Sequence, residues 1–173
     1  APDHAGDFLK LLGSGKEFGC KFTYEIQDTP GGIAQAFTIG ENFIGEDSVV
    51  LILGDNIYED DFSEAISSFK SGGRIFIKEV KDPQRFGVVE FDDNNKVLSI
   101  EEKPKVPKSS YAVTGMYIFD NTVLAKAKQL KPSDRGEVEI TDLNNLFLKE
   151  SSMDVAFVNG KWFDTGTFES LND

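Results

Sequence analysis

A short apolar run that ends abruptly in a glycine and a carboxylate places the strongest constraint on the fold of this chain. Residues 49–53 are all aliphatic, and Gly54-Asp55-Asn56 follows them directly. A continuous aliphatic run of this length indicates a strand buried on both faces, which is typical of a sheet covered by helices. Ligands of open α/β sheets bind beyond the carboxyl ends of such strands. We therefore expect Asp55 to lie at a ligand-binding edge of a sheet.

Strand patterns alternate with helix patterns along most of the chain. The predicted strands are residues 22–26, 49–53, 74–80, 111–119 and 154–158, and the predicted helices are residues 7–12, 33–43, 62–69, 123–130 and 143–147. Residues 86–91 and 97–100, joined by the turn at 92–95, predict a β-hairpin. The sequence therefore predicts an α/β fold with a mixed, mostly parallel sheet flanked by helices and a β-hairpin insertion.

The acidic composition argues against several classes of function. The 173 residues carry a formal net charge of −12 without a basic tract, so we expect no nucleic-acid partner, because such binders need a basic surface. No apolar run approaches the roughly 18 residues that span a bilayer, so we expect no membrane partner. The single cysteine, Cys20, cannot form an internal disulfide, and we expect a reduced thiol in a cytoplasmic protein.

A second carboxylate stands in a similar context near the end of the sequence. Asp164 follows Trp162 and Phe163 and precedes Thr165-Gly166. Two carboxylates that face each other across a crevice suit Mg²⁺ and a phosphorylated substrate. Taken alone, each aspartate fits an ordinary turn or helix cap equally well. An aspartic protease is excluded as a reading of Asp-Thr-Gly, because that fold is all-β and this chain alternates strands with helices.

Charged and glycine-rich segments supply candidate groups for binding anions. In Glu102-Lys103-Pro104 the lysine suits a phosphate and the glutamate suits sugar hydroxyls, although such charge clusters are usually only solvated. Arg135 suits a phosphate clamp, but such an arginine is more often a surface residue. The turn at residues 28–32 leaves backbone N–H groups at a helix start, which suits a base or a phosphate. That turn matches neither a Walker loop nor a dinucleotide fingerprint.

In their order and context, these motifs resemble the glucose-1-phosphate thymidylyltransferases, a family of sugar-nucleotide pyrophosphorylases. The resemblance runs from Tyr24 to Gly166 and therefore covers most of the chain. It is carried by the runs Gly31-Gly32-Ile33-Ala34-Gln35-Ala36-Phe37, Leu53-Gly54-Asp55-Asn56, Arg85-Phe86-Gly87-Val88-Val89-Glu90-Phe91, Glu101-Glu102-Lys103-Pro104, Tyr111-Ala112-Val113-Thr114-Gly115, Arg135-Gly136-Glu137-Val138-Glu139-Ile140-Thr141-Asp142 and Asp164-Thr165-Gly166.

The resemblance implies a role for each matching position. The implied roles are nucleotide binding for Gln27, Gly32 and Asp55; sugar-phosphate binding for Gly87, Glu102, Lys103, Val113 and Arg135; Mg²⁺ binding for Asp55 and Asp164; and catalysis for Asp55, Lys103, Arg135 and Asp164. Phe86 stands where relatives often have tyrosine, so an aromatic wall is kept and a hydroxyl is lost.

The resemblance also implies a reaction. Glucose 1-phosphate attacks the α-phosphorus of dTTP with Mg²⁺ as cofactor, and dTDP-glucose and pyrophosphate are the products, which feed polysaccharide synthesis in this family. Close alternatives are uridylyl or adenylyl transfer to a sugar 1-phosphate. An alternative of another class is a non-catalytic sugar-nucleotide-binding or assembly module on the same fold.

Two segments expected of this family have no counterpart in the sequence: an N-terminal glycine-rich signature loop that grips the triphosphate, and helices beyond the Asp-Thr-Gly motif. We therefore expect residues 1–173 to form a single truncated catalytic domain, an incomplete Rossmann-like nucleotidyltransferase fold with little or no activity. An incomplete sheet exposes a strand edge, so we also expect the chain to form a homo-oligomer.

Overall fold

The computed structural model describes residues 2–166, and in them strands and helices alternate along the chain. The strands are β1 (Val49–Ile52), β2 (Asn56–Tyr58), β3 (Gly73–Glu79), β4 (Gly87–Phe91), β5 (Val97–Glu102), β6 (Tyr111–Phe119), β7 (Met153–Phe157) and β8 (Trp162–Asp164). The α-helices are α1 (Ala5–Leu12), α2 (Gln35–Ile39), α3 (Glu41–Ile44), α4 (Ser63–Ser67), α5 (Val123–Gln129) and α6 (Ile140–Lys149). Short 3₁₀ turns cover Pro2–His4, Lys16–Phe18 and Pro83–Arg85.

Strand β6 is the centre of the main sheet. Nearly all of its residues are buried, and one of its edges pairs with β3 from end to end. The opposite edge has two partners, because the end of β6 pairs with β1 and its beginning meets β4 at Ala112 and Val88. The sheet order is β5-β4-β6-β3-β7, with β1 branching from β6, and β2 and β8 form a separate ribbon. β6 therefore changes neighbours along one edge.

The expected α/β class, mixed sheet, flanking helices and β4–β5 hairpin are confirmed, but the expectation that the sheet is mostly parallel is wrong. Among the described strands, only β3 and β7 pair in parallel, and the other pairings are antiparallel. β1 and β3 do run in the same direction on either side of α4, as the βαβ pattern predicts. The later strand β6 lies between them and antiparallel to both, and no local pattern specifies that insertion.

Three local expectations also need correction. Residues 22–26 pair with no described strand, although their alternation predicts one, because alternation by itself supplies no partner. The helix expected over residues 33–43 is divided into α2 and α3 at Gly40, and glycine is a poor helix former. β2 and β8 were not expected, since three-residue strands are too short to give a periodic signal.

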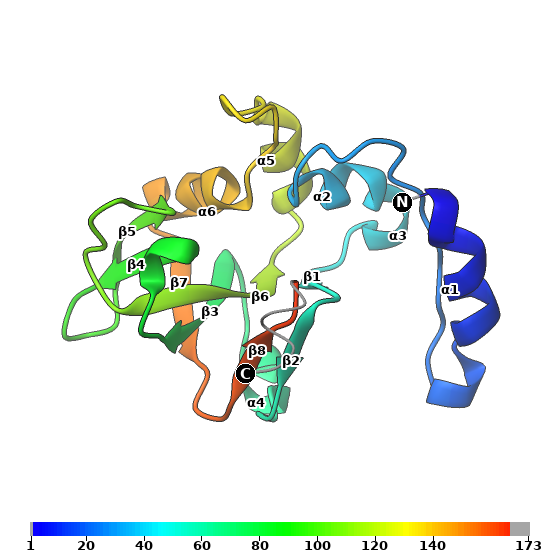
Figure 1. The fold of residues 1–173 in the computed structure, drawn as a ribbon, viewed down its shortest axis with the longest axis horizontal. Helices are drawn as coiled ribbons and strands as arrows, with labels where there is room; N and C mark the ends of the chain where they lie inside the picture. Colours follow the sequence, from blue (N-terminus) through cyan, green and yellow to red (C-terminus); the bar gives the residue numbers. More distant parts are fainter. Residues whose placement is uncertain (1, 167–173) are drawn as a thin grey trace.

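Apolar side chains cover both faces of the main sheet, and successive side chains along a strand point to opposite faces. Ile75 and Ile77 of β3 belong to the cluster under α2, α5 and α6, whereas Phe76 between them belongs to the cluster under α4 and the β2–β8 ribbon. Figure 1 shows these two layers on opposite sides of the sheet. In the first cluster, the ring of Phe119 lies 5.4 Å from Phe37 and 5.0 Å from Phe147.

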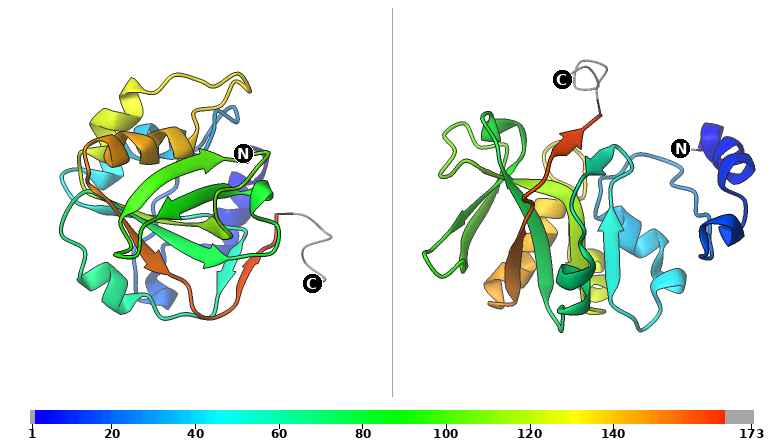
Figure 2. Two further views of the ribbon diagram at one scale, coloured as in Figure 1. Left: turned by 90° about the vertical axis from the view of Figure 1, so that its left-hand side faces the viewer. Right: turned by 90° about the horizontal axis from the view of Figure 1, so that it is seen from below.

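Helix α1 stands apart from the sheet in Figure 1 and in the right-hand view of Figure 2. Its apolar side chains Phe8, Leu9 and Leu11 are exposed, so in this state α1 contributes little to the core. None of the helices between residues 2 and 166 has the length and apolar character needed to cross a membrane.

The buried face of α6 contains a polar side chain without a hydrogen bond. Asn144 is 0% exposed, and neither Oδ1 nor Nδ2 has a partner in the described part of the chain. An unpaired buried polar group costs about 1–3 kcal/mol. We therefore expect Asn144→Leu to raise the free energy of unfolding, measured by urea titration, by about 1 kcal/mol.

The adjacent Asn145 provides a matched control for this substitution. Its Nδ2 donates to the Ile100 carbonyl at 3.2 Å, so we expect Asn145→Leu to lower the free energy of unfolding. A destabilised Asn144→Leu protein would contradict the prediction and show that the amide has a partner when the protein is in solution.

Candidate active site

A cleft opens at the point where β6 changes neighbours. Residues 113–115 lie between Ala112, which pairs with β4, and Met116, which pairs with β1, so β4 and β1 diverge here. β6 is also irregular at this point, because its ladder with β3 shifts register. Bulges of this kind bend a strand and occur often beside active sites. The cleft at the divergence has a volume of about 320 Å³.

The cleft gathers most of the side chains singled out in the sequence. Those lining it are Asp55, Gly87, Glu102, Lys103, Val113 and Asp164. Phe86, the expected aromatic wall, also lines it. Residues without an expected role that line it are Ile33, Leu53, Asn56, Arg85, Thr114, Gly115, Tyr117, Ile140, Thr141 and Trp162. The ends of β1, β5 and β8, the start of β4 and the middle of β6 therefore meet at one place.

Asp55 and Asp164 approach each other at one side of the cleft. The ladder of β2 with β8 sets Asn56 opposite Asp164, and the backbone N–H and hydroxyl of Thr165 both donate to the Asp55 carbonyl, at 2.7 and 2.8 Å. A β-carbon at Gly166 would lie 3.1 Å from Asp55 Oδ2 and 3.2 Å from Asp164 Oδ1. Both carboxylates therefore border one small volume that stays open because residue 166 is glycine.

Asn56 connects the aspartate side of the cleft to the central strand. Its Oδ1 accepts hydrogen bonds from Gly115 N at 2.9 Å, Trp162 Nε1 at 2.6 Å and the Tyr58 hydroxyl at 3.3 Å. Its Nδ2 donates to Asp55 Oδ1 at 2.8 Å. Burial raises the pKa of Tyr58 to about 12, so this hydroxyl keeps its proton at neutral pH. Asn56 thus fixes Asp55 while joining β2, β6 and β8.

Glu102 forms the opposite wall of the cleft. Thr141 Oγ1, at the start of α6, donates to Glu102 Oε2 at 2.6 Å, which fixes the carboxylate orientation. A β-carbon at Gly87 would lie 3.4–3.5 Å from Thr141, Glu102 and Val113. Glycine at this position therefore leaves space beside the carboxylate. The Tyr117 hydroxyl is deeply buried here, and that burial, with a further contribution from the Glu102 charge, holds its pKa well above the usual range.

Lys103 projects from an unusual backbone conformation at the mouth of the cleft. Its φ is +44°, which is uncommon for a residue other than glycine, and its N–H donates to the Phe86 carbonyl at 3.0 Å. Pro104 follows, just beyond the end of β5 at Glu102, and cannot donate a backbone hydrogen bond to a continued ladder. Lys103 Nζ lies 4.0 Å from Glu102 Oε1, with about half of the side chain exposed. The ammonium is therefore directed to the cleft and remains accessible to an anion.

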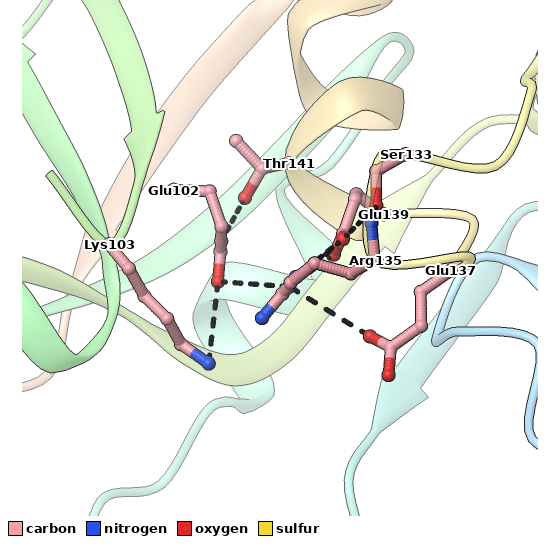
Figure 3. A network of polar contacts seen from close by, with 7 residues as sticks. All are labelled: Glu102, Lys103, Ser133, Arg135, Glu137, Glu139 and Thr141. Atoms are coloured by element: carbon pink, nitrogen blue, oxygen red, sulfur yellow. Dashed lines mark hydrogen bonds and ion pairs between the residues drawn. The ribbon is translucent and has the colours of Figure 1, made fainter.

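Arg135 does not line the cleft itself but lies at its rim. Its Nη2 is 4.0 Å from Glu102 Oε1, so it shares that carboxylate with Lys103. Figure 3 shows the Lys103 and Arg135 side chains on either side of Glu102, with Arg135 held from behind by Glu139. The hydrogen bonds to Glu139 are the main cause that raises the pKa of Arg135 above its usual value.

Gln27 and Gly32 lie in an adjoining hollow of about 380 Å³, which shares Ile33 and Leu53 with the cleft. Gln27 Nε2 donates to Gln35 Oε1 at 2.6 Å, which ties its side chain to α2. Gly32 has a φ of +96°, and a β-carbon there would collide with the Val138 backbone. The two residues are thus neighbours of the carboxylate cleft but do not line it.

Sequence reasoning gave no role to several residues that shape the cleft. Asn56 belongs to the motif that contains Asp55, and Trp162, the single tryptophan, stands two residues before Asp164. The centres of the Trp162 and Phe86 rings lie 5.2 Å apart, so the expected aromatic wall at Phe86 packs against β8. Thr141 and Glu139 belong to the motif that begins at Arg135. Their place in or beside a motif was the only sign in the sequence that these residues matter. Their roles become clear only from their contacts with residues that are distant in sequence.

Comparisons with known proteins agree with this geometry. The nucleotidyl transferase family model matches residues 1–173. The glucose-1-phosphate thymidylyltransferase of Neisseria meningitidis is 49% identical to this chain in an alignment that covers 100% of it. That of Mycolicibacterium smegmatis is 48% identical in an alignment that covers 99% of it. The chain spans 62% of the length of these curated relatives. The crystal structure of a proposed glucose-1-phosphate thymidylyltransferase from Bacillus anthracis, in complex with a sucrose, superposes with a TM-score of 0.90 at 50% identity, over 96% of this chain and 69% of that one.

Because Asn56 makes several hydrogen bonds, we expect its replacement to destabilise the protein more than replacement of an exposed asparagine. Asn56→Ala leaves Gly115 N and Trp162 Nε1 without their acceptor, so we expect the free energy of unfolding to fall by about 2–4 kcal/mol. Asn56→Asp keeps the acceptor beside a second carboxylate and should lose less. Asn94→Ala, at the exposed hairpin turn, serves as control and should stay within about 0.5 kcal/mol in urea titration. Equal losses for Asn56→Ala and Asn94→Ala would refute the role of Asn56.

Proposed function

The chain belongs to the nucleotidyl transferase family, and from that premise we propose that its cleft transfers a thymidylyl group from dTTP to glucose 1-phosphate, giving dTDP-glucose and pyrophosphate. The observation that carries the proposal is the meeting of Asp55 and Asp164 with Glu102 and Lys103 in one cleft. Two relatives named glucose-1-phosphate thymidylyltransferase match almost the whole chain at 48–49% identity, which supports these substrates.

The proposed substrates occupy the cleft and the adjoining hollow. Glu102, oriented by Thr141, accepts hydrogen bonds from sugar hydroxyls. Gly87 and Val113 leave room for the sugar ring. The phosphate of the sugar binds Lys103 and Arg135, which flank Glu102. In the adjoining hollow, Gln27 and Gly32 contact the nucleotide base.

The chemistry requires alignment and charge neutralisation more than acid–base catalysis. An oxygen of the glucose 1-phosphate bonds to the α-phosphorus of dTTP. The bond from that phosphorus to the oxygen of the β-phosphate breaks, and pyrophosphate leaves with the electron pair. Because both reactants are anions, Lys103 and Arg135 lower the barrier by holding positive charge beside the attacking phosphate.

Asp55 and Asp164 fit a divalent cation, which nucleotidyl transferases generally use, and we assign Mg²⁺ to this pair. Their oxygens border one small open volume at Gly166. Within residues 2–166, no three acidic, histidine or cysteine side chains gather as a metal site. A pair of carboxylates suits Mg²⁺, which usually completes its shell with water and substrate phosphates. When bound, Mg²⁺ neutralises charge on the α-phosphate.

The setting of the proposed enzyme follows from two surface features. Cys20 is an exposed free thiol, which supports a reducing compartment such as the cytoplasm. Exposed apolar side chains of α1 and the unpaired segment at residues 22–26, including Phe8, Leu11 and Ile26, support association of the chain into a homo-oligomer.

Release of pyrophosphate from dTTP and glucose 1-phosphate in the presence of Mg²⁺ tests the proposal. Because Asp55 is a proposed Mg²⁺ ligand, we expect Asp55→Asn to reduce the rate by about 100-fold or more. Asp93→Asn removes an equal charge at the exposed turn of the β4–β5 hairpin, at the opposite end of the hairpin from the cleft residues Gly87 and Glu102, and should leave the rate within about twofold.

The choice of nucleotide separates the proposal from its alternatives. Faster turnover with UTP or ATP than with dTTP would show that the chain is a uridylyl or adenylyl transferase instead. Because little activity is expected of this chain, calorimetric binding of dTDP-glucose without turnover favours a non-catalytic sugar-nucleotide-binding module only if Asp55→Asn binds dTDP-glucose as tightly as the parent chain in the presence of Mg²⁺. A protein that neither turns over nor binds these ligands would contradict both.

A further inference from the structure

We propose that Glu139 is the positioning residue for Arg135: it holds the guanidinium at the rim of the cleft in the orientation that receives the phosphate of the sugar. The inference rests on the proposed function and adds a residue to the recognition of the sugar phosphate. Figure 3 shows the arrangement, with Glu139 behind Arg135 and Glu102 between Arg135 and Lys103.

The contacts of Arg135 distinguish Glu139 from the other nearby carboxylates. Arg135 Nε donates to Glu139 Oε1 at 3.1 Å, and Nη2 donates to both Glu139 oxygens at 2.9 Å. Glu137 and Glu102 lie 3.8 and 4.0 Å from Nη2 without a hydrogen bond. The bonds to Glu139 therefore use one side of the guanidinium. No acceptor among the described residues contacts Nη1 on the other side, so that group remains for an anion.

Burial makes this pairing durable. The Glu139 side chain is 13% exposed, against 47% for Glu137, and its remaining partner is the Ser133 hydroxyl at 2.7 Å. If Arg135 left, a largely buried carboxylate would keep only a neutral donor, which is costly. We therefore expect Arg135 to stay bound to Glu139 when a phosphate arrives and to offer it Nη1.

The backbone around Glu139 is also fixed. Val138, the preceding residue, donates its N–H to the Gly31 carbonyl at 2.8 Å and accepts from Ala34 N at 3.3 Å. Glu139 has an extended backbone and directly precedes α6. The glycine loop of the nucleotide hollow thus anchors the residue that orients the phosphate-binding arginine.

The opposite role would be a latch, in which Glu139 occupies Arg135 until phosphate displaces it. The two roles predict opposite signs for Glu139→Gln, which removes the charge and leaves one acceptor oxygen. A positioning residue predicts weaker binding of glucose 1-phosphate, because Arg135 loses its fixed orientation. A latch predicts tighter binding, because a competing anion has been removed.

Titration calorimetry with glucose 1-phosphate measures this sign. We expect Glu139→Gln to raise the dissociation constant about tenfold, and Glu137→Gln, which removes an equal charge from the same cluster, to change it by less than about threefold. Affinity for dTTP should change less than affinity for the sugar phosphate in Glu139→Gln. In an Arg135→Ala background, Glu139→Gln should cause no further loss, because a positioning residue acts through its partner.

Tighter binding by Glu139→Gln, or an equal loss in the Arg135→Ala background, would overturn the proposal. The Arg135 Nε–H resonance in NMR spectra of the ligand-free chain gives a test that needs no substrate. Its exchange with solvent should be slow in the parent chain and in Glu137→Gln and fast in Glu139→Gln, and equal rates would overturn the positioning role. A parent chain that shows the slow resonance but binds neither glucose 1-phosphate nor orthophosphate would refute the proposed function instead.

Discussion

The candidate site depends on β6 having two different partners along one edge. Its end pairs with β1 and its beginning meets β4, and two strands that leave the same edge in different places must separate. The separation opens the cleft, while β3 supports the other edge of β6 from end to end. Asp55, Glu102, Lys103 and Val113 come from segments that meet at this divergence. Side chains held by paired strands are therefore presented to an open cleft.

The cleft places cations beside the proposed phosphate site, although both the chain and the cleft lining also carry carboxylates. With a net charge of −12, the chain repels anions at long range, but salt screens charges more than about 8 Å apart under physiological conditions. Attraction of a phosphate is therefore decided by nearby cations. Arg85 and Lys103 line the cleft, and Arg135 stands at its rim. The carboxylates Glu102 and Glu139 keep Lys103 and Arg135 in place, so that the local positive charge is oriented as well as present.

Features with a local cause were predictable from the sequence. The hairpin of β4 and β5 and the bounds of β6 depend on neighbouring residues, and the structure places them where the pattern indicates. The aliphatic run before Asp55 does form β1, but the expectation that this strand is buried on both faces is wrong. Among the described strands, β1 pairs only with β6, its residues are at most part-buried, and Ile52 is exposed. The relative directions of the strands in the sheet were not predictable, because β6, from a later part of the chain, is inserted between β1 and β3. The same limit applies to the site. The proximity of Asp55 to Asp164 was expected from motif resemblance, whereas the connecting role of Asn56 depends on bonds to Gly115 and Trp162, which are distant in sequence.

The position of the Trp162 indole determines what the fluorescence of this protein reports. It is the single tryptophan of the chain, its Nε1–H is bonded to Asn56, and its ring lies beside Phe86. Indole emission responds to the polarity and hydrogen bonding around the ring. All tryptophan fluorescence of the chain therefore originates at the wall of the cleft, a few atoms from Asp55, and no second indole contributes to it. The protein carries an intrinsic spectroscopic probe at the place where its chemistry is proposed to occur.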